Sequence, residues 1–278
     1  MIIDAHHHLW TADYPWLAAE ELAPIRRAYT VDDLRRNTAA AGVDGTVLVE
    51  AGRCDLAETR SFLALAARTP EILGVVGWVS FEDPALKSTL DALRAGPGGR
   101  FLVGLRDQVQ AWSEPERLEA PGTASNLAAA GEAGLVVDLV VRRDQLPACA
   151  RVAAAAPETT FVLDHLGKPR VAPESLAQWR ELVTPLAARP NVVAKLSGLL
   201  TEIPAGSPRS IDSFVDAALE LFGPDRLMIG SDWPVCELVA SYGDTWRALV
   251  NCLAGLSGAE RTAILSGTAI RTYRLETL

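Results

Sequence analysis

The chain has 278 residues, of which 49% are hydrophobic and 22% charged, and its formal net charge at pH 7 is −9. This composition is typical of a globular protein and argues against a disordered or fibrous class. Because 35 acidic residues stand against 26 basic ones, no basic face is available for a phosphate backbone, and nucleic acid is not the expected partner.

The cysteines and the apolar segments indicate a reducing, aqueous environment. The four cysteines, Cys54, Cys149, Cys236 and Cys252, are scattered without a C-x-x-C spacing, which is typical of reduced thiols in a cytosolic protein. No apolar run approaches the roughly 20 residues that cross a bilayer. The start of the chain lacks the basic region of a signal peptide. We therefore expect a cytoplasmic protein without a membrane partner.

Short apolar segments rich in β-branched residues alternate with longer segments of helical period. The eight predicted strands are Ile2–Ala5, Thr46–Glu50, Leu73–Ser80, Phe101–Leu105, Leu135–Val141, Thr160–Leu163, Val192–Leu196 and Leu227–Gly230. Continuously apolar strands favour a parallel sheet covered by helices, because both faces of such a sheet are buried.

The helices predicted between these strands have recognisable ends. Thr30 and Asp33 form a start similar to a capping box, and Gly42 ends that helix. Asp83 before Pro84 predicts an N-cap for a helix that ends near Gly96. The remaining predicted helices are Leu56–Arg68, Thr123–Ala130, Gln145–Ala156, Pro173–Ala188, Ser210–Phe222, Asp244–Leu253 and Gly258–Ile270.

Eight strand–helix units in a chain of this length predict an α/β fold, a single (β/α)8 barrel domain over residues 1–278. A doubly wound open sheet is the alternative, and it is weakened because no G-x-G-x-x-G follows the first strand. Long segments follow four strands: Leu9–Tyr29, Arg106–Gly122, Ser197–Arg209 and Asp232–Gly243. In a barrel these segments open on the carboxyl face, where active sites are built.

The first candidate site is the run Asp4-Ala5-His6-His7-His8. Alternate side chains of an extended strand share a face, so His6 and His8 should point together into the barrel mouth and His7 away from it. Two neutral imidazoles on one face suit a metal ion. The competing interpretation is a tag remnant or a chance cluster.

Two further candidates end strands six and eight. His165 follows the sixth strand, and its neighbour Asp164 should point to the opposite side and hold a helix or loop. Asp232 ends the eighth strand, where a carboxylate can bind a metal and take a proton from an attacking water. A helix cap or a salt bridge is the competing role for Asp232. Together with His6 and His8, these residues should converge at one mouth.

Other side chains near the strand ends have two alternative roles, in catalysis or binding and in structural ion pairs. Arg106 can polarise a carbonyl or hold a carboxylate, and structural ion pairing is the alternative for it and its charged neighbours. Candidates for substrate binding from their positions are Glu50, Trp78, Gln110, Lys195 and Trp233. Tryptophans that could line the pocket and determine which substrate fits are Trp10, Trp16, Trp78, Trp112 and Trp233.

These motifs resemble the amidohydrolase-2 group of the amidohydrolase superfamily, in the branch of sugar-acid lactonases that contains L-fuconolactonases and L-rhamnonolactonases. The matching segments run from end to end: Ile3–Trp10, Val76–Val79, Val103–Gln110, Asp138–Arg142, Asp144–Pro147, Phe161–Pro169, Lys195–Gly198 and Gly230–Pro234. The resemblance implies a distorted barrel that hydrolyses an ester or lactone. It also implies functional histidines at His6, His8 and His165, and a general base at Asp232.

The resemblance further implies one divalent metal ion, usually zinc, although some lactonases of the group work without a metal. The expected ligands are His6, His8, His165 and Asp232. Two positions depart from the family pattern, since Asp107 stands where histidine commonly follows Gly-Leu-Arg, and Glu50 stands where glutamine is common. We expect Asp107 to contact the substrate, and both acids to distinguish this protein from its relatives.

The resulting hypothesis is hydrolysis of a small-molecule lactone. Asp232 takes a proton from a metal-activated water, which attacks the ring carbonyl, and then returns the proton to the leaving ring oxygen. In a metal-free version, His165 and Arg106 polarise the carbonyl. A metal-dependent decarboxylase of the same fold is one alternative, and a catalytically silent barrel that binds a sugar acid is another. The motifs specify no oligomeric state.

Overall fold

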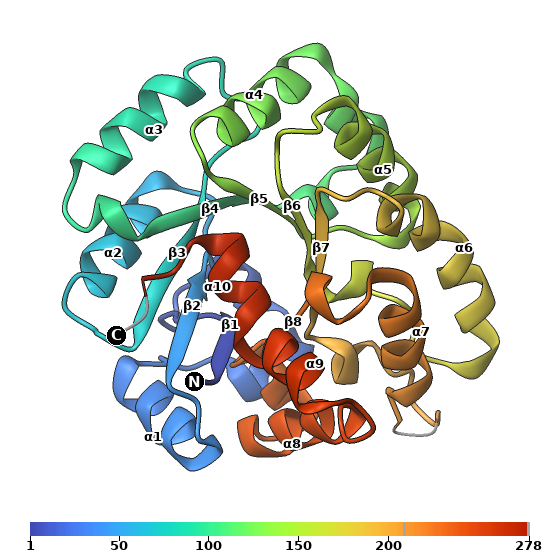
Figure 1. The fold of residues 1–278 in the computed structure, drawn as a ribbon. Helices are drawn as coiled ribbons and strands as arrows, with labels where there is room; N and C mark the ends of the chain where they lie inside the picture. The colour runs from blue at the N-terminus through green and yellow to red at the C-terminus, as the bar shows by residue number, and fades with distance from the viewer. Residues whose placement is uncertain (208–209, 277–278) are drawn as a thin grey trace.

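The computed structural model describes residues 1–207 and 210–276, and its eight parallel strands form one sheet in sequential order. The strands are β1 (Ile3–His7), β2 (Gly45–Val49), β3 (Ile72–Trp78), β4 (Leu102–Asp107), β5 (Val136–Leu139), β6 (Phe161–Leu163), β7 (Val192–Leu196) and β8 (Leu227–Ile229). Figure 1 shows these strands around a common axis, with helices surrounding them and the red C-terminal helix across one end. The predicted (β/α)8 barrel is confirmed, and the alternative prediction of an open doubly wound sheet is wrong.

The helices follow the strands as the sequence pattern predicts. They are α1 (Val31–Ala41), α2 (Leu56–Ala66), α3 (Leu86–Ala95), α4 (Pro121–Glu132), α5 (Leu146–Ala155), α6 (Leu176–Ala187), α7 (Asp212–Phe222), α8 (Tyr242–Cys252), α9 (Gly258–Thr262) and α10 (Thr268–Tyr273). At α1, Thr30 and Asp33 form a capping box, and Gly42 ends the helix in a left-handed conformation with φ 68°.

Two helices differ from the sequence prediction. Helix α3 has Ala85 as its N-cap, because Asp83 instead closes a turn by accepting hydrogen bonds from the Ala85 amide (2.8 Å) and the Thr89 hydroxyl (3.1 Å). The single helix predicted over 258–270 is interrupted, since a π-helical turn (Ala263–Gly267) separates α9 from α10.

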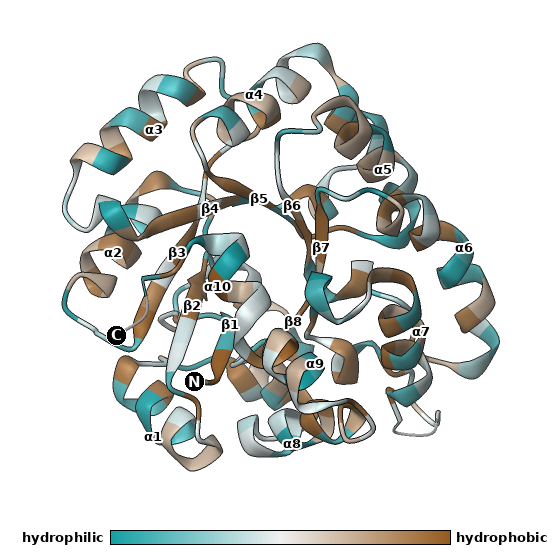
Figure 2. Ribbon diagram, in the orientation of Figure 1, coloured by the Kyte–Doolittle hydropathy of each residue, from teal (hydrophilic) through white to brown (hydrophobic). Residues whose placement is uncertain are grey.

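Apolar side chains fill both the barrel interior and the layer between sheet and helices. Figure 2 shows the strands as largely hydrophobic, with hydrophilic residues on the outer helices. Ala269 and Tyr273 of α10 pack with interior strand residues such as Ile3 and Val136. Helix α10 therefore closes the amino-terminal end of the barrel, opposite the carboxyl ends of the strands (Figure 1).

The barrel closes between β1 and β8 through a short seam. Neighbouring strands elsewhere pair along several residues, whereas β1 meets the end of β8 through a bridge between His7 and Trp233. The amide of His8 donates to the Trp233 carbonyl (2.7 Å), and the amide of Asp232 donates to the His6 carbonyl (2.8 Å). The seam therefore lies at the carboxyl end, beside the candidate site.

No helix within residues 1–207 and 210–276 is long and apolar enough to cross a membrane. Pro208 and Arg209, which end the predicted long segment Ser197–Arg209, lie outside the described residues.

Candidate active site

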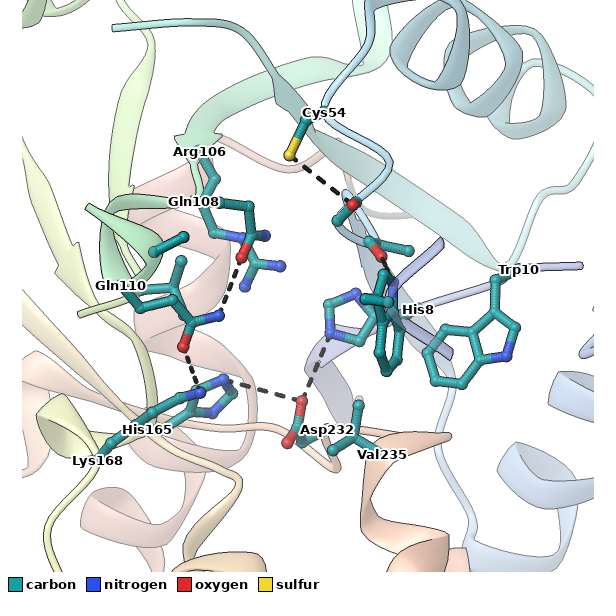
Figure 3. Close-up of a pocket in the computed structure, with 15 residues that line it drawn as sticks. His8, Trp10, Cys54, Arg106, Gln108, Gln110, His165, Lys168, Asp232 and Val235 are labelled. Carbon is teal, nitrogen blue, oxygen red and sulfur yellow. Dashed lines mark hydrogen bonds and ion pairs between the residues drawn. The ribbon is translucent and has the colours of Figure 1, made fainter. Parts of the chain in front are cut away.

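A cavity of about 380 Å³ opens at the carboxyl ends of the strands (Figure 3). Five of its lining residues are predicted catalytic, metal-binding or substrate-binding residues: His8, Arg106, Gln110, His165 and Asp232. The segments after β1, β4 and β8 contribute to the lining as predicted, whereas the described part of the segment after β7 does not. The size suits a small-molecule ligand.

His6 and His8 point to the same side of β1, as the alternation predicts. Their Nε2 atoms lie 3.3 Å apart, whereas the Nε2 of His7 lies 3.0 Å from the Thr46 hydroxyl, away from the barrel axis. The pairing register between β1 and β2 shifts between Asp4 and His7. His6 is completely buried beneath the cavity floor, whereas 5% of the surface of His8 is exposed at that floor.

His165 reaches this cluster through an unusual backbone conformation. β6 ends at Leu163, and His165 has a φ of 55°, in the left-handed region that non-glycine residues rarely adopt. Its Nδ1 lies 2.8 Å from the Ser197 hydroxyl, which leaves Nε2 facing the site. Burial lowers the pKa of His165 to about 4 and that of His6 well below its usual value, so both rings are neutral at pH 7.

Asp232 faces the three imidazoles with one carboxylate oxygen. Its Oδ1 lies 3.6 Å from Nε2 of His6, 3.5 Å from Nε2 of His8 and 3.8 Å from Nε2 of His165. Burial alone raises the pKa of Asp232, but the interactions with His165, His8 and His6 outweigh it and hold the pKa below its usual range. Asp232 also has a left-handed backbone, with φ 56°.

The donor set fits a divalent metal ion such as zinc. Ligands about 2.0–2.1 Å from a tetrahedral zinc lie about 3.3 Å from one another, close to the separations among His6, His8 and Asp232. The Nδ1 of His8 lies 3.0 Å from the Val49 carbonyl, and a proton donated there leaves Nε2 free for a metal. Neutral imidazoles and an ionised carboxylate are the protonation states that a metal requires.

Asp164 corrects the sequence prediction, because it points into the barrel rather than away from the site. Its Oδ1 lies 3.3 Å from Nδ1 of His6, and its Oδ2 accepts a hydrogen bond from Arg106 (2.9 Å). Val162 faces the interior, so strict alternation along β6 places Asp164 inward as well. The left-handed turn at His165 then returns the next side chain to the same side.

Arg106 lies between the cavity and two buried carboxylates. Its Nε donates to Glu50 (2.6 Å), its Nη1 to Asp164 (2.9 Å) and its Nη2 to the Glu50 carbonyl (2.8 Å). Burial alone lowers the pKa of Arg106, but the two carboxylates raise it above its usual value. These contacts use three of the five N–H groups of the guanidinium, and Nη1 also lies 3.4 Å from Nε2 of His6. The guanidinium also lines the cavity.

Lys195 lies beneath the site in a buried ionic cluster. Its Nζ is 2.5 Å from Asp138, 3.0 Å from Asp164 and 3.1 Å from Nδ1 of His6. Despite burial, the cations of Lys195 and Arg106, together with His6, hold the pKa of Asp164 well below its usual value. The ion-pairing alternative therefore describes the observed contacts of Lys195, which forms no part of the cavity lining.

Four other predicted substrate-binding residues also lie outside the cavity lining. Glu50 is buried against Arg106 and the Gly52 amide. Asp107 faces outward, because its neighbour Arg106 faces inward, and it accepts hydrogen bonds from Trp78 (3.0 Å) and from backbone amides. Trp233 is buried and donates to Glu237 (2.7 Å). Each of these four residues contacts other protein groups instead of lining the cavity.

Sequence reasoning overlooked two polar residues of the cavity, Gln108 and Lys168. Both lie within the family motifs: Gln108 is two residues after Arg106, and Lys168 is three residues after His165. Of the tryptophans considered for the pocket, Trp10 and Trp16 line it. Periodicity alone did not show these contacts, because all four residues lie in segments beyond the strand ends.

Comparisons with known proteins place this architecture in a family. An L-fucono-1,5-lactonase of Burkholderia multivorans is 39% identical over 290 residues, covering 98% of this chain and 96% of that protein. An L-fucono-1,5-lactonase of Burkholderia ambifaria is 32% identical, covering 99% and 96%. A crystal structure of an amidohydrolase from Burkholderia multivorans with bound zinc has a TM-score of 0.92 and 37% identity, covering 99% and 100%. The amidohydrolase family model matches residues 3–275, and the chain belongs to that family.

Proposed function

We propose that the protein hydrolyses the lactone of a sugar acid. The observation that carries this proposal is the convergence of His8, His165 and Asp232 at the floor of a cavity large enough for one sugar ring, with His6 directly beneath them. The similarity to L-fucono-1,5-lactonases supports a sugar-acid lactone as the substrate class.

Asp232 is the proposed general base. Its Oδ1 faces the three imidazoles, which leaves Oδ2 to accept a proton from the attacking water and to return it to the leaving ring oxygen. A divalent ion held by His6, His8, His165 and Asp232, zinc in this proposal, supplies Lewis-acid chemistry that favours ionisation of water and polarises a carbonyl. Arg106 lines the cavity and can donate a remaining N–H group to the carbonyl oxygen.

The first test is Asp232→Asn, assayed by acid release from a panel of 1,4- and 1,5-lactones. The variant should lose roughly 10²–10⁴-fold in kcat, because the amide cannot accept the proton. Circular dichroism should match that of the wild type, which separates lost chemistry from lost fold. Undiminished turnover would contradict the assignment of Asp232.

Elemental analysis tests the metal. The purified protein should carry one divalent ion per chain, and His6→Ala should lose it. His7→Gln is the matched control, because His7 faces Thr46 rather than the site and should leave the metal content unchanged. A metal-free protein with full lactonase activity would contradict the metal part of the proposal.

The same preparation distinguishes the two alternative functions. Carbon dioxide release from aromatic or unsaturated acids, without acid release from lactones, would indicate a decarboxylase. Tight binding of a sugar acid without turnover, in the presence of zinc, manganese or magnesium, would indicate a silent binding barrel.

A further inference from the structure

Three polar side chains of the cavity form a continuous chain of hydrogen bonds. Lys168 Nζ donates to Gln110 Oε1 (2.5 Å), and Gln110 Nε2 donates to Gln108 Oε1 (2.9 Å). Gln108 Nε2 then donates to Glu50 Oε1 (2.5 Å). Figure 3 shows Gln108, Gln110 and Lys168 along one side of the pocket, opposite Trp10. We call these three residues the donor wall.

The direction of this chain is fixed at both ends. Lys168 can only donate, and the carboxylate of Glu50, which is ion-paired with Arg106, can only accept. Reversing either glutamine amide would place two donors or two acceptors against each other. Both amide oxygens are therefore used within the chain.

The donor wall consequently offers the ligand N–H groups. Each glutamine amide retains one N–H beyond the chain, and the Lys168 ammonium retains two. All three residues line the cavity, so these groups are available to a bound molecule. A ligand group that supplies an acceptor oxygen therefore matches this side best.

The aromatic part of the cavity has the opposite character. The indole N–H of Trp10 donates to the Ile25 carbonyl (3.3 Å), and that of Trp16 donates to the Ala51 carbonyl (2.8 Å). The two rings contact each other edge to face, with centroids 5.1 Å apart. Because their polar atoms are occupied, Trp10 and Trp16 present carbon surface to the ligand.

We propose that the donor wall determines substrate choice by binding the hydroxyl oxygens of a polyhydroxylated lactone ring, whose apolar C–H surface lies against Trp10 and Trp16. Gln110, at the centre of the chain, is the key specificity residue. The inference rests on the proposed lactone hydrolysis and adds a requirement for ring hydroxyls away from the reacting carbonyl. A lactone without hydroxyls leaves the N–H groups unpaired in a partly buried site.

The test compares two lactones of equal ring size, glucono-1,5-lactone and δ-valerolactone, which lacks hydroxyls. Gln110→Glu is nearly isosteric and replaces the amide N–H groups with an acceptor. We expect it to lower kcat/KM for the hydroxylated lactone by about 10-fold relative to δ-valerolactone, chiefly through KM. Lys168→Met, which keeps side-chain length but removes the N–H groups, should shift the ratio in the same direction.

Asn251→Asp is the matched control. Asn251 is exposed on α8 and does not line the cavity, so this variant also replaces an amide with a carboxylate without altering the donor wall. It should leave the ratio unchanged. Equal losses for both lactones in Gln110→Glu, or no loss at all, would overturn the specificity role while leaving the proposed lactonase activity intact.

A binding measurement separates the two proposals. The neutral ring 1,5-anhydroglucitol carries hydroxyls but cannot be hydrolysed, and calorimetry should show weaker binding to Gln110→Glu than to the wild type. A wild-type protein that opens no lactone would contradict the proposed function. Even in that case, unchanged binding of this ring in Gln110→Glu would overturn the donor wall, and weakened binding would support it.

Discussion

The position of His165 depends on the absence of a side chain at Gly198. Gly198 has a φ of 63°, and a Cβ there would lie 2.7 Å from His165 Nδ1 and 3.1 Å from Asp232 Oδ2. A methyl group at Gly198 would therefore displace an imidazole and a carboxylate of the candidate site, in addition to imposing a left-handed conformation on a residue with a Cβ.

We predict that Gly198→Ala weakens metal binding by about 10–100-fold, the range typical of changes to groups that orient metal ligands. Gly42→Ala is the matched control, because Gly42 has a similar φ of 68° but no atom within 4 Å of the added Cβ. Both variants should lose roughly 1–2 kcal/mol of unfolding free energy from the backbone alone. Metal titration should distinguish them, and equal metal affinities would contradict this role of Gly198.

Glu58 provides a pH-dependent test at the same scale. It is 4% exposed, and its Oε1 accepts hydrogen bonds from the Tyr14 hydroxyl (2.7 Å) and the Ala51 amide (3.2 Å). Burial, with a contribution from Glu50, raises the pKa of Glu58 from 4.5 to about 7. Between these two values the folded protein binds a proton that the unfolded chain has released, so this group favours folding at lower pH.

We predict that wild-type stability relative to Glu58→Gln decreases as pH rises from 4.5 through 7. The decrease should reach up to about 3 kcal/mol, because each unit of pKa difference corresponds to about 1.4 kcal/mol. Urea unfolding of both proteins at pH 5 and pH 8 measures this difference. A stability difference between the two proteins that does not change with pH would contradict a raised pKa of Glu58 in the folded state.

At the scale of elements, helix α10 is connected to the site through the barrel interior. The Tyr273 hydroxyl lies 2.8 Å from Asp138 Oδ2, and Asp138 pairs with Lys195, whose Nζ lies 3.1 Å from Nδ1 of His6. This helix at the amino-terminal end of the barrel therefore reaches, through two buried side chains, the histidine beneath the cavity floor.

We predict that Tyr273→Phe lowers the free energy of unfolding by about 1–3 kcal/mol, because it leaves the buried Asp138 without one donor. It should also lower metal affinity, since the position of Lys195 beside His6 depends on Asp138. Urea unfolding and metal titration measure the two effects. Unchanged metal affinity together with lowered stability would restrict Tyr273 to a structural role.

The strands show which structural features sequence periodicity can predict. The eight apolar runs predict every strand, and alternation predicts that His6 and His8 share a face from which His7 points away. On β4 the carboxylate of Asp107 contacts Trp78 and the Phe81 amide instead of lining the cavity, so its charge does not reach the predicted substrate position. The left-handed turn at His165 could not be predicted, because a positive φ at a non-glycine residue follows from tertiary contacts rather than from local preference.

The predicted helix over 258–270 shows a second limit. Its composition indicates a helix, but its pattern contains no sign of a π-helical turn or of a position across the barrel end. Gln108 and Lys168 of the donor wall were overlooked for a similar reason, since they follow strand ends where period-two alternation no longer applies. Motif identity, rather than periodicity, was the signal available for Lys168.

At the scale of the whole molecule, the candidate metal ligands lie on both sides of the seam that closes the barrel. His6 and His8 belong to the β1 side, whereas Asp232 follows β8. Backbone hydrogen bonds from the amides of His8 and Asp232 cross the same seam. A bound ion would therefore link the first and last strands of the sheet as well as supply chemistry.

We predict that removing the metal loosens the seam before the rest of the barrel. An ion present at 100 times its Kd contributes about 2.7 kcal/mol to stability, so treatment with a chelator should lower Tm measurably. Hydrogen exchange should accelerate at the amides of His8 and Asp232. It should change little at the Val137 amide of β5, which donates to the Thr160 carbonyl (3.0 Å) next to β6.

His6→Ala is the control, and its Tm should not fall further when chelator is added. Acceleration spread evenly over all strands would contradict a role of the ion at the seam, because it would show that the metal stabilises the barrel only as a whole.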